Sequence, residues 1–293
     1  MSYEHGQGAK RMPGWMRRPI AHQGDYRAVK GLMDQLGLHT VCQSAKCPNQ
    51  GECFASGTAT FLVAGDVCTR GCRFCAVTTA TPQPLDAQEP AHVAEAVVAL
   101  GLAHVVITMV TRDDVEDGAA GHLAAVLRAV RRAAPKTRIE VLTSDFGGKM
   151  SSVDAVIEAG PDVFNHNLET VPRLYGAVRP GAEYTRSLAV LSRVKQRAPE
   201  MPTKSGLMLG LGETPGEVVE VMRDLRGVGC DMLTLGQYLR PSARHLPVAE
   251  FVTPEVFESL ACEATSLGFS AVASAPFVRS SYHAAEMVTQ PRG

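Results

Sequence analysis

The feature that most constrains the fold is a repeated alternation of short apolar runs with longer segments, which begins near residue 58. Each run has the length and composition of one β-strand. Strands that alternate with helices form parallel sheets, because a parallel pair needs a long crossover connection. The runs are FLVAG (61–65), HVVITMV (104–110), RIEVLTS (138–144), VFNHNLE (163–169), SGLMLG (205–210) and MLTLGQY (232–238).

The segments between these runs carry apolar residues at helical spacing. Apolar positions recur at i, i+3, i+4 and i+7 over residues 93–100, 123–130 and 218–225, so each segment predicts a helix with one buried face. Six right-handed βα units close only part of an eight-stranded barrel, so the predicted fold is α/β, a partial (β/α)6 barrel of the TIM type. The ligand site of such a sheet lies at the carboxyl ends of its strands.

The chain continues beyond this barrel at both ends. Residues 1–57 are rich in Gly, Pro, Gln and Cys and have no sustained apolar period, which predicts an irregular N-terminal extension. The barrel is assigned to residues 58–276, where a helix over 254–267 and a short apolar run come last. Residues 277–293 are assigned to a polar C-terminal tail.

Composition and charge argue against several classes of protein. The 293 residues include 29 Lys and Arg against 30 Asp and Glu, so a net charge of −1 gives no overall field that favours nucleic acid or an anionic membrane. No stretch approaches the ~18–20 uninterrupted apolar residues of a membrane span. The basic stretch 10–20 contains prolines and little amphipathic order, unlike a transit peptide. We therefore expect a cytoplasmic protein that binds neither nucleic acid nor membrane.

Three cysteines directly follow the first predicted strand. The run DVCTRGCRFCAV places Cys68, Cys72 and Cys75 at C-x3-C-x2-C spacing on one loop. Thiolates select soft metals, so the candidates are an iron–sulfur cluster and zinc. Three ligands leave one iron of a four-iron cluster open, as catalytic metal sites require. The alternative zinc site needs a fourth Cys or His nearby, and residues 54–91 contain none besides the triad.

A second triad lies upstream in the run TVCQSAKCPNQGECF. It places Cys42, Cys47 and Cys53 at C-x4-C-x5-C spacing, so six of the eight cysteines fall within residues 42–75. Without an evident export signal, such crowding favours metal ligation over disulfide bonds.

Both triads and a C-terminal motif resemble those of a known family. The first triad, with Phe74 before its last cysteine, resembles the cluster-binding loop of the radical SAM (S-adenosylmethionine) superfamily. The second triad resembles the auxiliary-cluster motif of the lipoyl synthase family, and VRSSYHA (278–284) matches that family's RSSY element. The resemblance extends over roughly residues 12–285 and implies a barrel of the radical SAM type.

The resemblance implies two 4Fe-4S clusters and SAM as a co-substrate. It assigns Cys68, Cys72 and Cys75 to the catalytic cluster that binds SAM, and Cys42, Cys47 and Cys53 to the auxiliary cluster. A serine of the RSSY element completes the auxiliary cluster, and we assign this role to Ser281, with Ser280 as the alternative. A serine alkoxide is a hard ligand for iron, so this bond should be more labile than a thiolate bond.

The implied reaction is the insertion of two sulfur atoms, taken from the auxiliary cluster, at carbons six and eight of an octanoyl chain on a carrier lysine. The implied partners are the octanoylated lipoyl carrier domain and a low-potential electron donor such as ferredoxin or flavodoxin. Another radical SAM sulfur-inserting enzyme is the nearest alternative. A non-catalytic two-cluster electron carrier is a different class, which predicts four protein ligands for each cluster.

Further polar and aromatic residues near the predicted strand ends are candidates for the site, because ligands of parallel sheets bind there. Predicted SAM-binding residues are Phe74, Arg112, Asn167, Glu169 and Lys204. Predicted residues of the substrate entrance are Arg179, Gln237, Arg240 and His245. Cys230 and Cys262 lie outside both triads and are interpreted as small buried apolar residues.

Overall fold

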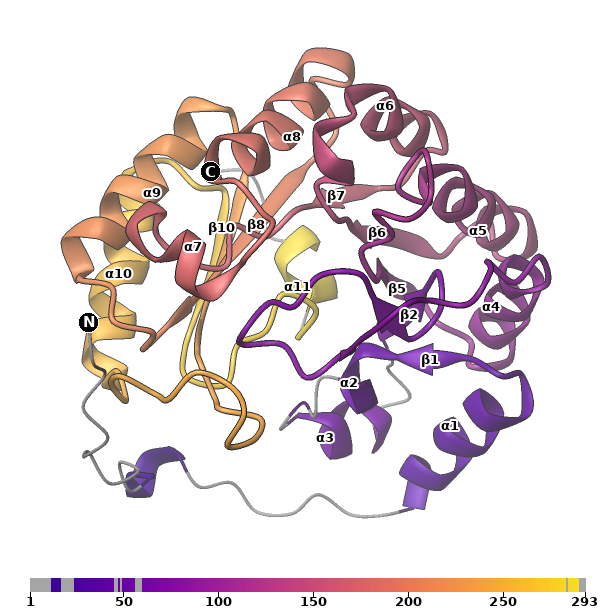
Figure 1. Ribbon diagram of the computed structural model, residues 1–293, viewed down its shortest axis with the longest axis horizontal. Coiled ribbons are helices and arrows are strands. Elements are labelled where there is room, and N and C mark those ends of the chain that lie inside the picture. Colours follow the sequence, from indigo (N-terminus) through magenta and orange to yellow (C-terminus); the bar gives the residue numbers. More distant parts are fainter. Residues whose placement is uncertain are drawn as a thin grey trace.

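An eight-stranded sheet, curved into an open barrel, forms the centre of the molecule in a computed structural model (Figure 1). The structure describes residues 12–16, 24–44, 47, 49–55, 60–282 and 284–289. The strand order is β1-β2-β5-β6-β7-β8-β9-β10, and neighbours from β2 to β10 are parallel. The parallel strands are β2 (Thr60–Val63), β5 (His104–Met109), β6 (Arg138–Leu142), β7 (Val163–Asn165), β8 (Thr203–Leu209), β9 (Met232–Gln237) and β10 (Ala271–Ser274).

The predicted parallel sheet is confirmed, with one additional parallel strand. Each of the six predicted runs contains a strand, and β10 adds a seventh beside β9, with Ala271 opposite Met232. A small parallel ribbon lies after β2 and consists of β3 (Val67–Cys68) and β4 (Thr78–Thr79). This ribbon places the first cysteine triad at the carboxyl end of the barrel.

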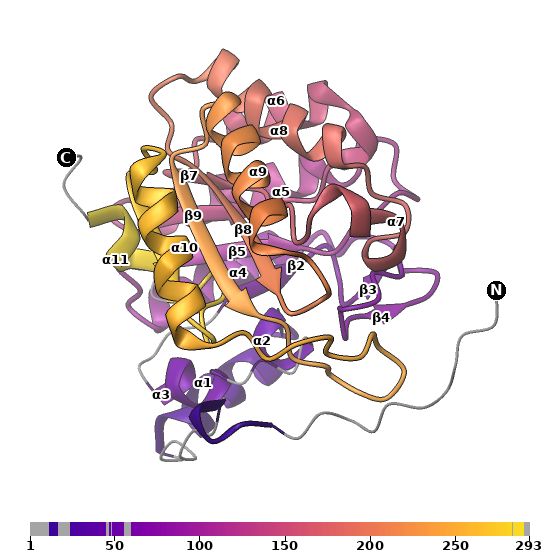
Figure 2. The ribbon, with the colours of Figure 1, turned by 90° about the vertical axis from the view of Figure 1, so that its left-hand side faces the viewer.

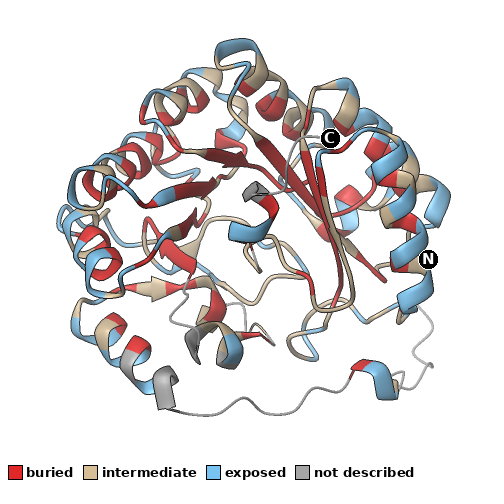
Figure 3. Ribbon diagram, turned by 180° about the vertical axis from the view of Figure 1, so that it is seen from behind, coloured by how far each residue is buried: buried red, intermediate tan, exposed pale blue. Residues whose placement is uncertain are grey.

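Helices cover the outside of the sheet and bury one face each, as Figure 3 shows by the buried residues on their inner sides. The long helices around the barrel are α4 (Glu89–Ala99), α5 (Ala120–Ala133), α6 (Met150–Glu158), α8 (Tyr184–Arg197), α9 (Pro215–Gly227) and α10 (Pro254–Ser266). Shorter elements are α7 (Tyr175–Val178) and three 3-10 helices, η1 (Gly14–Met16), η2 (Phe146–Gly148) and η3 (Pro172–Leu174). Within the part of the chain that the structure describes, no helix has the length and apolar character of a membrane span.

The N-terminal segment is more regular than its sequence predicts. It contains α1 (Gly24–Gln35), β1 (His39–Thr40), α2 (Val41–Ser44) and α3 (Gln50–Ala55). The prediction of an irregular extension is therefore corrected over these residues. Val29 and Met33, four positions apart on α1, are buried in the main core, and β1 pairs antiparallel with β2. Much of the basic stretch 10–20 lies outside the described residues.

The C-terminal segment runs inside the barrel instead of forming a solvated tail. Its last described element is α11 (Ala284–Thr289), which lies among the strands when the molecule is seen from behind (Figure 3). Met287 packs against Val163, Met232 and Ala271, each the first residue of its strand. In Figure 2, α11 lies on the side of the sheet opposite the β3–β4 ribbon. The segment thus closes the floor of the barrel, while the open mouth lies at the carboxyl ends of the strands.

Candidate active site

A cavity of about 470 Å³ opens at the carboxyl ends of the parallel strands. Residues of both cysteine triads and of the C-terminal RSSY element form parts of its wall. These are Cys42, Cys47, Cys68, Cys72, Cys75, Ser280 and Ser281. Cys53 is half-buried and packs against the main core, and it is not one of the residues that line the cavity. The fold therefore brings together cysteines and serines that lie more than two hundred positions apart in the sequence.

The loop of the first triad is fixed by main-chain hydrogen bonds to three other loops. The Thr69 amide donates to the Thr111 carbonyl oxygen at 3.0 Å. The amide of Arg73 donates to the carbonyl of residue 178 at 2.9 Å, and the carbonyl of Arg73 accepts from the amide of residue 246 at 3.1 Å. His245 Nε2 donates to the Cys75 carbonyl oxygen at 2.9 Å. His245, predicted at the substrate entrance, thus supports the cysteine loop.

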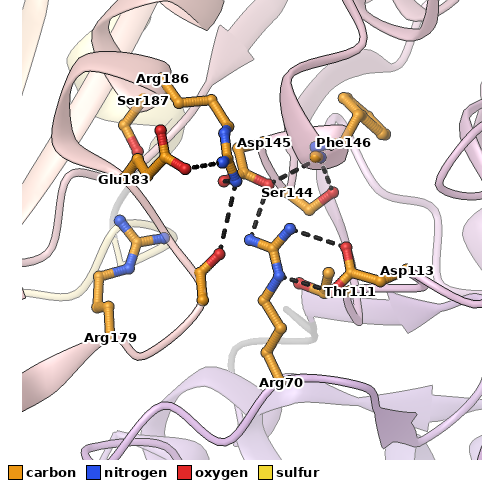
Figure 4. A network of polar contacts seen from close by, with 12 residues as sticks. Arg70, Thr111, Asp113, Ser144, Asp145, Phe146, Arg179, Glu183, Arg186 and Ser187 are labelled. Carbon is orange, nitrogen blue, oxygen red and sulfur yellow. Dashed lines mark hydrogen bonds and ion pairs between the residues drawn. The ribbon is translucent and has the colours of Figure 1, made fainter. Parts of the chain in front are cut away.

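An ion-pair network anchors this loop to the barrel through Arg70 (Figure 4). Its guanidinium forms two hydrogen bonds with Asp113, at 2.7 and 2.8 Å, and a 2.7 Å ion pair with the buried Asp145. Arg186 also contacts Asp145, at 3.3 Å, and pairs with Glu183. Burial disfavours the Arg70 cation, but the two carboxylates outweigh burial and raise its pKa. The loop of the first triad is therefore held by an Arg70 guanidinium that stays charged.

Arg70 and Asp145 were not predicted from the sequence, although the position of each residue gave a reason to consider it. Arg70 is a cation between two cysteines of the C-x3-C spacing, and because arginine does not ligate a metal, another role could have been expected for it. Asp145 follows the third predicted strand by one residue. Only the barrel shows that these residues meet, because the register of parallel neighbours decides which loops face each other.

Burial keeps several of the cysteine thiols protonated in the absence of a metal. It raises the pKa of Cys42 to about 11 and that of Cys75 to about 12. Burial also raises the pKa of Cys72, although the nearby Arg179 guanidinium partly opposes the shift. Thiolates form at such sites when a metal displaces the proton. All eight cysteines are free, so none of them is bound in a disulfide.

Asn167 and Glu169 line the cavity and lie after the end of β7 instead of within the strand, and their contact with SAM stays a prediction. Asn167 Nδ2 donates to Glu169 Oε1 at 3.0 Å and to Ser280 Oγ at 2.6 Å. Arg179 lies beside them and donates to the carbonyl oxygens of Asn167 and Leu168, each at 3.0 Å. Burial raises the pKa of Glu169, and Arg179 opposes this shift. The wall therefore presents a carboxyl group and an amide close to Cys72.

The auxiliary triad is tied to the RSSY element by two long-range hydrogen bonds. Asn49 Nδ2 donates to the Phe277 carbonyl oxygen at 2.8 Å. The Tyr282 hydroxyl donates to Glu52 Oε1 at 2.8 Å. Within the triad, the amide of Cys47 donates to the carbonyl of residue 42 at 3.0 Å. These bonds hold the residues on either side of Ser280 and Ser281 against the segment that carries the auxiliary cysteines.

Two glycines allow the RSSY segment to enter the barrel. At Gly206, an added Cβ would lie 2.5 Å from Thr234 Oγ1 on β9, 3.0 Å from Asn167 Oδ1 and 3.1 Å from Ser280 Oγ. At Gly236, an added Cβ would overlap the Val278 carbonyl oxygen. Only glycine leaves the space that the segment fills against β8 and β9.

Two of the predicted SAM-binding residues do not reach the cavity. Arg112 is buried. Its guanidinium donates to the carbonyl oxygens of Ala64 and Gln83 and forms an ion pair with Asp114. Lys204 is fully buried in a 2.8 Å ion pair with Glu140. Lys204 is the second residue of β8 and lies in the half of the barrel near the floor. Both predictions are corrected, because these cations already have protein partners below or outside the cavity.

The remaining predicted residues outside the triads differ in whether they line the cavity and in how far they are buried. Phe74 lines the cavity, and its contact with SAM stays a prediction. Gln237 lines it too, but its amide is used by main-chain groups, including the carbonyl of residue 250 and the amide of residue 252. Cys230 is buried, as expected, whereas Cys262 is exposed on α10, which corrects its interpretation as a buried residue.

Known proteins match this chain closely. The model of the radical SAM superfamily matches residues 62–225. The lipoyl synthase of Nitrosococcus oceani is 57% identical over 276 residues, covering 94% of this chain and 85% of that protein. The lipoyl synthase of Caldanaerobacter subterraneus subsp. tengcongensis is 53% identical over 283 residues, covering 97% and 99%. The chain belongs to the lipoyl synthase family. Membership in this family implies two 4Fe-4S clusters and SAM.

Solved structures share the fold of this lipoyl synthase family member at low sequence identity. Methylornithine synthase aligns with a TM-score of 0.54 and 16% identity, covering 86% of this chain and 74% of that one. The coproporphyrinogen III oxidase of Escherichia coli, a radical SAM enzyme, aligns with a TM-score of 0.53 and 12% identity, covering 71% and 52%. These likenesses confirm the partial barrel of the radical SAM type.

The donor set fits the clusters that the lipoyl synthase family implies. Among the described residues, no three His, Cys, Asp or Glu side chains are placed to hold a single metal ion. In a four-iron cluster each thiolate binds a different iron, so its ligands surround a body larger than one ion. The cysteines of both triads are free, and five of the six lie along the wall of one cavity.

Proposed function

We propose that this member of the lipoyl synthase family inserts two sulfur atoms at carbons six and eight of an octanoyl-lysine on a lipoyl carrier domain. The observation that supports this proposal best is the shared cavity. Its wall carries residues of both triads and the two serines of the RSSY element. A cavity shared by both triads allows one substrate chain to meet both centres without leaving the protein.

The first triad would hold the catalytic cluster and orient SAM. We assign Cys68, Cys72 and Cys75 as its three ligands, which leaves one iron for SAM. When bound, the clusters and SAM supply the deoxyadenosyl radical and the sulfur. Phe74 and the Asn167–Glu169 wall are the proposed contacts of SAM, because they line the cavity beside this loop.

The second triad would hold the auxiliary cluster, with Ser281 as its fourth ligand. Both RSSY serines line the cavity, but Ser280 Oγ already accepts a 2.6 Å hydrogen bond from Asn167. This bond supports Ser281 as the ligand and gives Ser280 the role of an anchor. We assign Cys42, Cys47 and Cys53 as the three thiolate ligands.

The remaining wall suits an octanoyl chain. Apolar side chains from several strands of the barrel and from the loops that follow them line the same cavity. Among them are Leu62, Val110, Leu142, Met208 and Leu239. A saturated chain is stabilised by contact with such a surface, and water is excluded from the reacting carbons.

The partners follow from this reaction. An octanoylated carrier domain would supply the substrate, and a low-potential donor such as ferredoxin or flavodoxin would supply electrons. The free cysteines support a cytoplasmic location, because a reducing compartment keeps thiols reduced.

The test is anaerobic reconstitution with iron and sulfide, followed by reaction with SAM, dithionite and an octanoyl-lysine peptide. We expect 5′-deoxyadenosine and a peptide that gains two sulfur atoms, both measured by mass spectrometry. A Ser281→Ala variant should still cleave SAM but lose sulfur insertion. SAM cleavage without sulfur insertion by the unaltered protein would reject the substrate, and absence of cleavage would reject the radical reaction.

A further inference from the structure

The side chain of Asn167 hydrogen-bonds to groups on two walls of the cavity. It follows β7, is 7% exposed and uses both amide hydrogens, one toward Glu169 Oε1 and one toward Ser280 Oγ. A carboxylate accepts hydrogen bonds, so the contact with Glu169 fixes Nδ2 on this side of the amide. Oδ1 is buried and has no hydrogen-bond partner among the described residues.

The Glu169 end of this contact is rigid. Glu169 has a left-handed backbone conformation (φ 67°), and its main-chain groups bond to β8 through the carbonyl of Gly206 and the amide of Met208, both at 2.9 Å. Arg179 adds two hydrogen bonds to the main chain just before Glu169. The position of the Asn167 amide is therefore set by the barrel.

The Ser280 end lies in the threaded C-terminal segment. Ser280 is next to Ser281 in the chain, so a bond that fixes Ser280 also limits where Ser281 lies. The close approach to Gly206 leaves the segment little room to shift sideways. Asn167 hydrogen-bonds the segment to the SAM-side wall, and Arg279 of the same segment adds an electrostatic attraction to Glu169.

We infer that Asn167 is a positioning residue that links the auxiliary site to the SAM site, because its amide holds Ser280 against the Glu169 wall. The inference rests on the proposed function, in which Ser281 is a ligand of the auxiliary cluster. A donor group of SAM at the unpartnered Oδ1 would keep Nδ2 turned toward Ser280. Occupancy of the SAM site therefore tightens the binding of the auxiliary cluster, and an intact auxiliary cluster tightens SAM binding by the same factor. The tighter cluster should lose its iron more slowly.

The experiment measures iron release from the reconstituted full chain to EDTA, with and without SAM. SAM cleavage is assayed on the same samples and reports the first cluster. In the unaltered protein SAM should slow the loss of auxiliary iron. In Asn167→Ala the loss should be about tenfold faster, as for other residues that orient metal ligands, and SAM should have no effect on it.

A matched control variant removes another asparagine side chain, which lies deeper in the barrel. Asn165 is the last residue of β7, two positions before Asn167, and it is buried and bonds to Glu140 instead of the RSSY segment. Asn165→Ala should release iron at the unaltered rate and keep the SAM effect. Equal acceleration in both variants would overturn the inference, because it would indicate general loosening of the barrel.

A double variant separates this inference from the proposed function. If Asn167 acts through Ser281, then Asn167→Ala combined with Ser281→Ala should lose iron no faster than Ser281→Ala alone. Additive rates would overturn the link through Ser281. If Ser281→Ala itself retained iron as the unaltered protein does, the ligand assignment would fail, and the inference that depends on it would fall with it.

Discussion

Arg70 lies between Cys68 and Cys72 and joins their loop to the ends of β5 and β6. Its planar guanidinium binds Asp113 with two hydrogen bonds and reaches Asp145 with its remaining nitrogen. A lysine has one charged nitrogen and cannot reproduce this geometry. The spacing of the cysteines defines which atoms bind iron, whereas Arg70 determines where the loop that carries them is held.

Arg70→Lys should therefore weaken the first site while preserving its thiols. We expect SAM cleavage to fall by about 10–100-fold, the usual effect of losing a residue that orients metal ligands. The measurement is the rate of 5′-deoxyadenosine formation at equal iron content. Arg173→Lys is the control, because Arg173 makes a similar two-bond contact with Glu217 at an exposed position. Similar losses in both variants would argue against a specific role for Arg70.

His166 makes the stability of the folded protein depend on pH. It is buried, its Nδ1 donates to the Thr143 carbonyl oxygen at 2.9 Å, and burial lowers its pKa to about 4. A histidine in the unfolded chain titrates near 6.5, so the unfolded state takes up this proton first as the pH falls. The stability due to neutral His166 is thus complete above pH 6.5 and is lost as the pH falls to about 4.

The expected loss is on the order of 3 kcal/mol, since one pKa unit corresponds to about 1.4 kcal/mol. Urea unfolding of the iron-free protein between these pH values measures it. His166→Gln should flatten the pH dependence, whereas His92→Gln, a half-buried position on α4, should not. Identical slopes for the unaltered protein and His166→Gln would contradict this account.

Among the elements, the strands with strong apolar runs were predictable and the segments that fill the barrel were not. β10 lies in the short apolar run that ends the predicted barrel, but this run of AVAS was not counted as a strand, because its small alanines, which leave room for Met287, give a weaker signal than the other runs. α1 carries apolar residues at helical spacing, with Val29, Leu32 and Met33 in the helix and Leu36 just after it, and this short period was overlooked. The RSSY segment packs on a surface made by distant strands, and no local period predicts its place.

The helix α11 should contribute to stability through Met287. Met287→Ala would leave a gap among Val163, Met232 and Ala271, and we expect it to lower the free energy of unfolding by ~2–5 kcal/mol. Urea unfolding measures the change. The exposed Met12 provides the control, since Met12→Ala should change stability by less than about 0.5 kcal/mol. A similarly small change at Met287 would mean that α11 does not hold the floor.

For the whole molecule, the sequence identified the chemistry of the site but not its full set of residues. The cysteine triads and the RSSY element have fixed spacings, so they were recognised without a structure. Lys204 and Arg112 were placed in the site because they lie near strands, but depth along the barrel decides which polar residues reach the cavity. Glu140, the partner of Lys204, lies 64 positions away, and only the sheet register brings the two together.

The proposed clusters would connect three separate parts of the chain: the N-terminal segment, the first barrel loop and the C-terminal segment. Metal bound only by the folded state stabilises that state. We expect the iron-loaded protein to unfold at a higher temperature than the iron-free protein under anaerobic conditions. Calorimetry of both forms tests this expectation, and equal unfolding temperatures would show that the clusters do not link these parts.

The threaded C-terminal segment also sets an order for biosynthesis. Residues 277–282 follow every strand of the sheet in the chain, so the sheet is synthesised before the segment that fills its interior. The contact between Tyr282 and Glu52 spans 230 positions of the chain and forms only after Tyr282 has been synthesised. The proposed auxiliary site is therefore completed late, because its N-terminal cysteines must wait for the RSSY segment before iron and sulfide meet the full set of ligands.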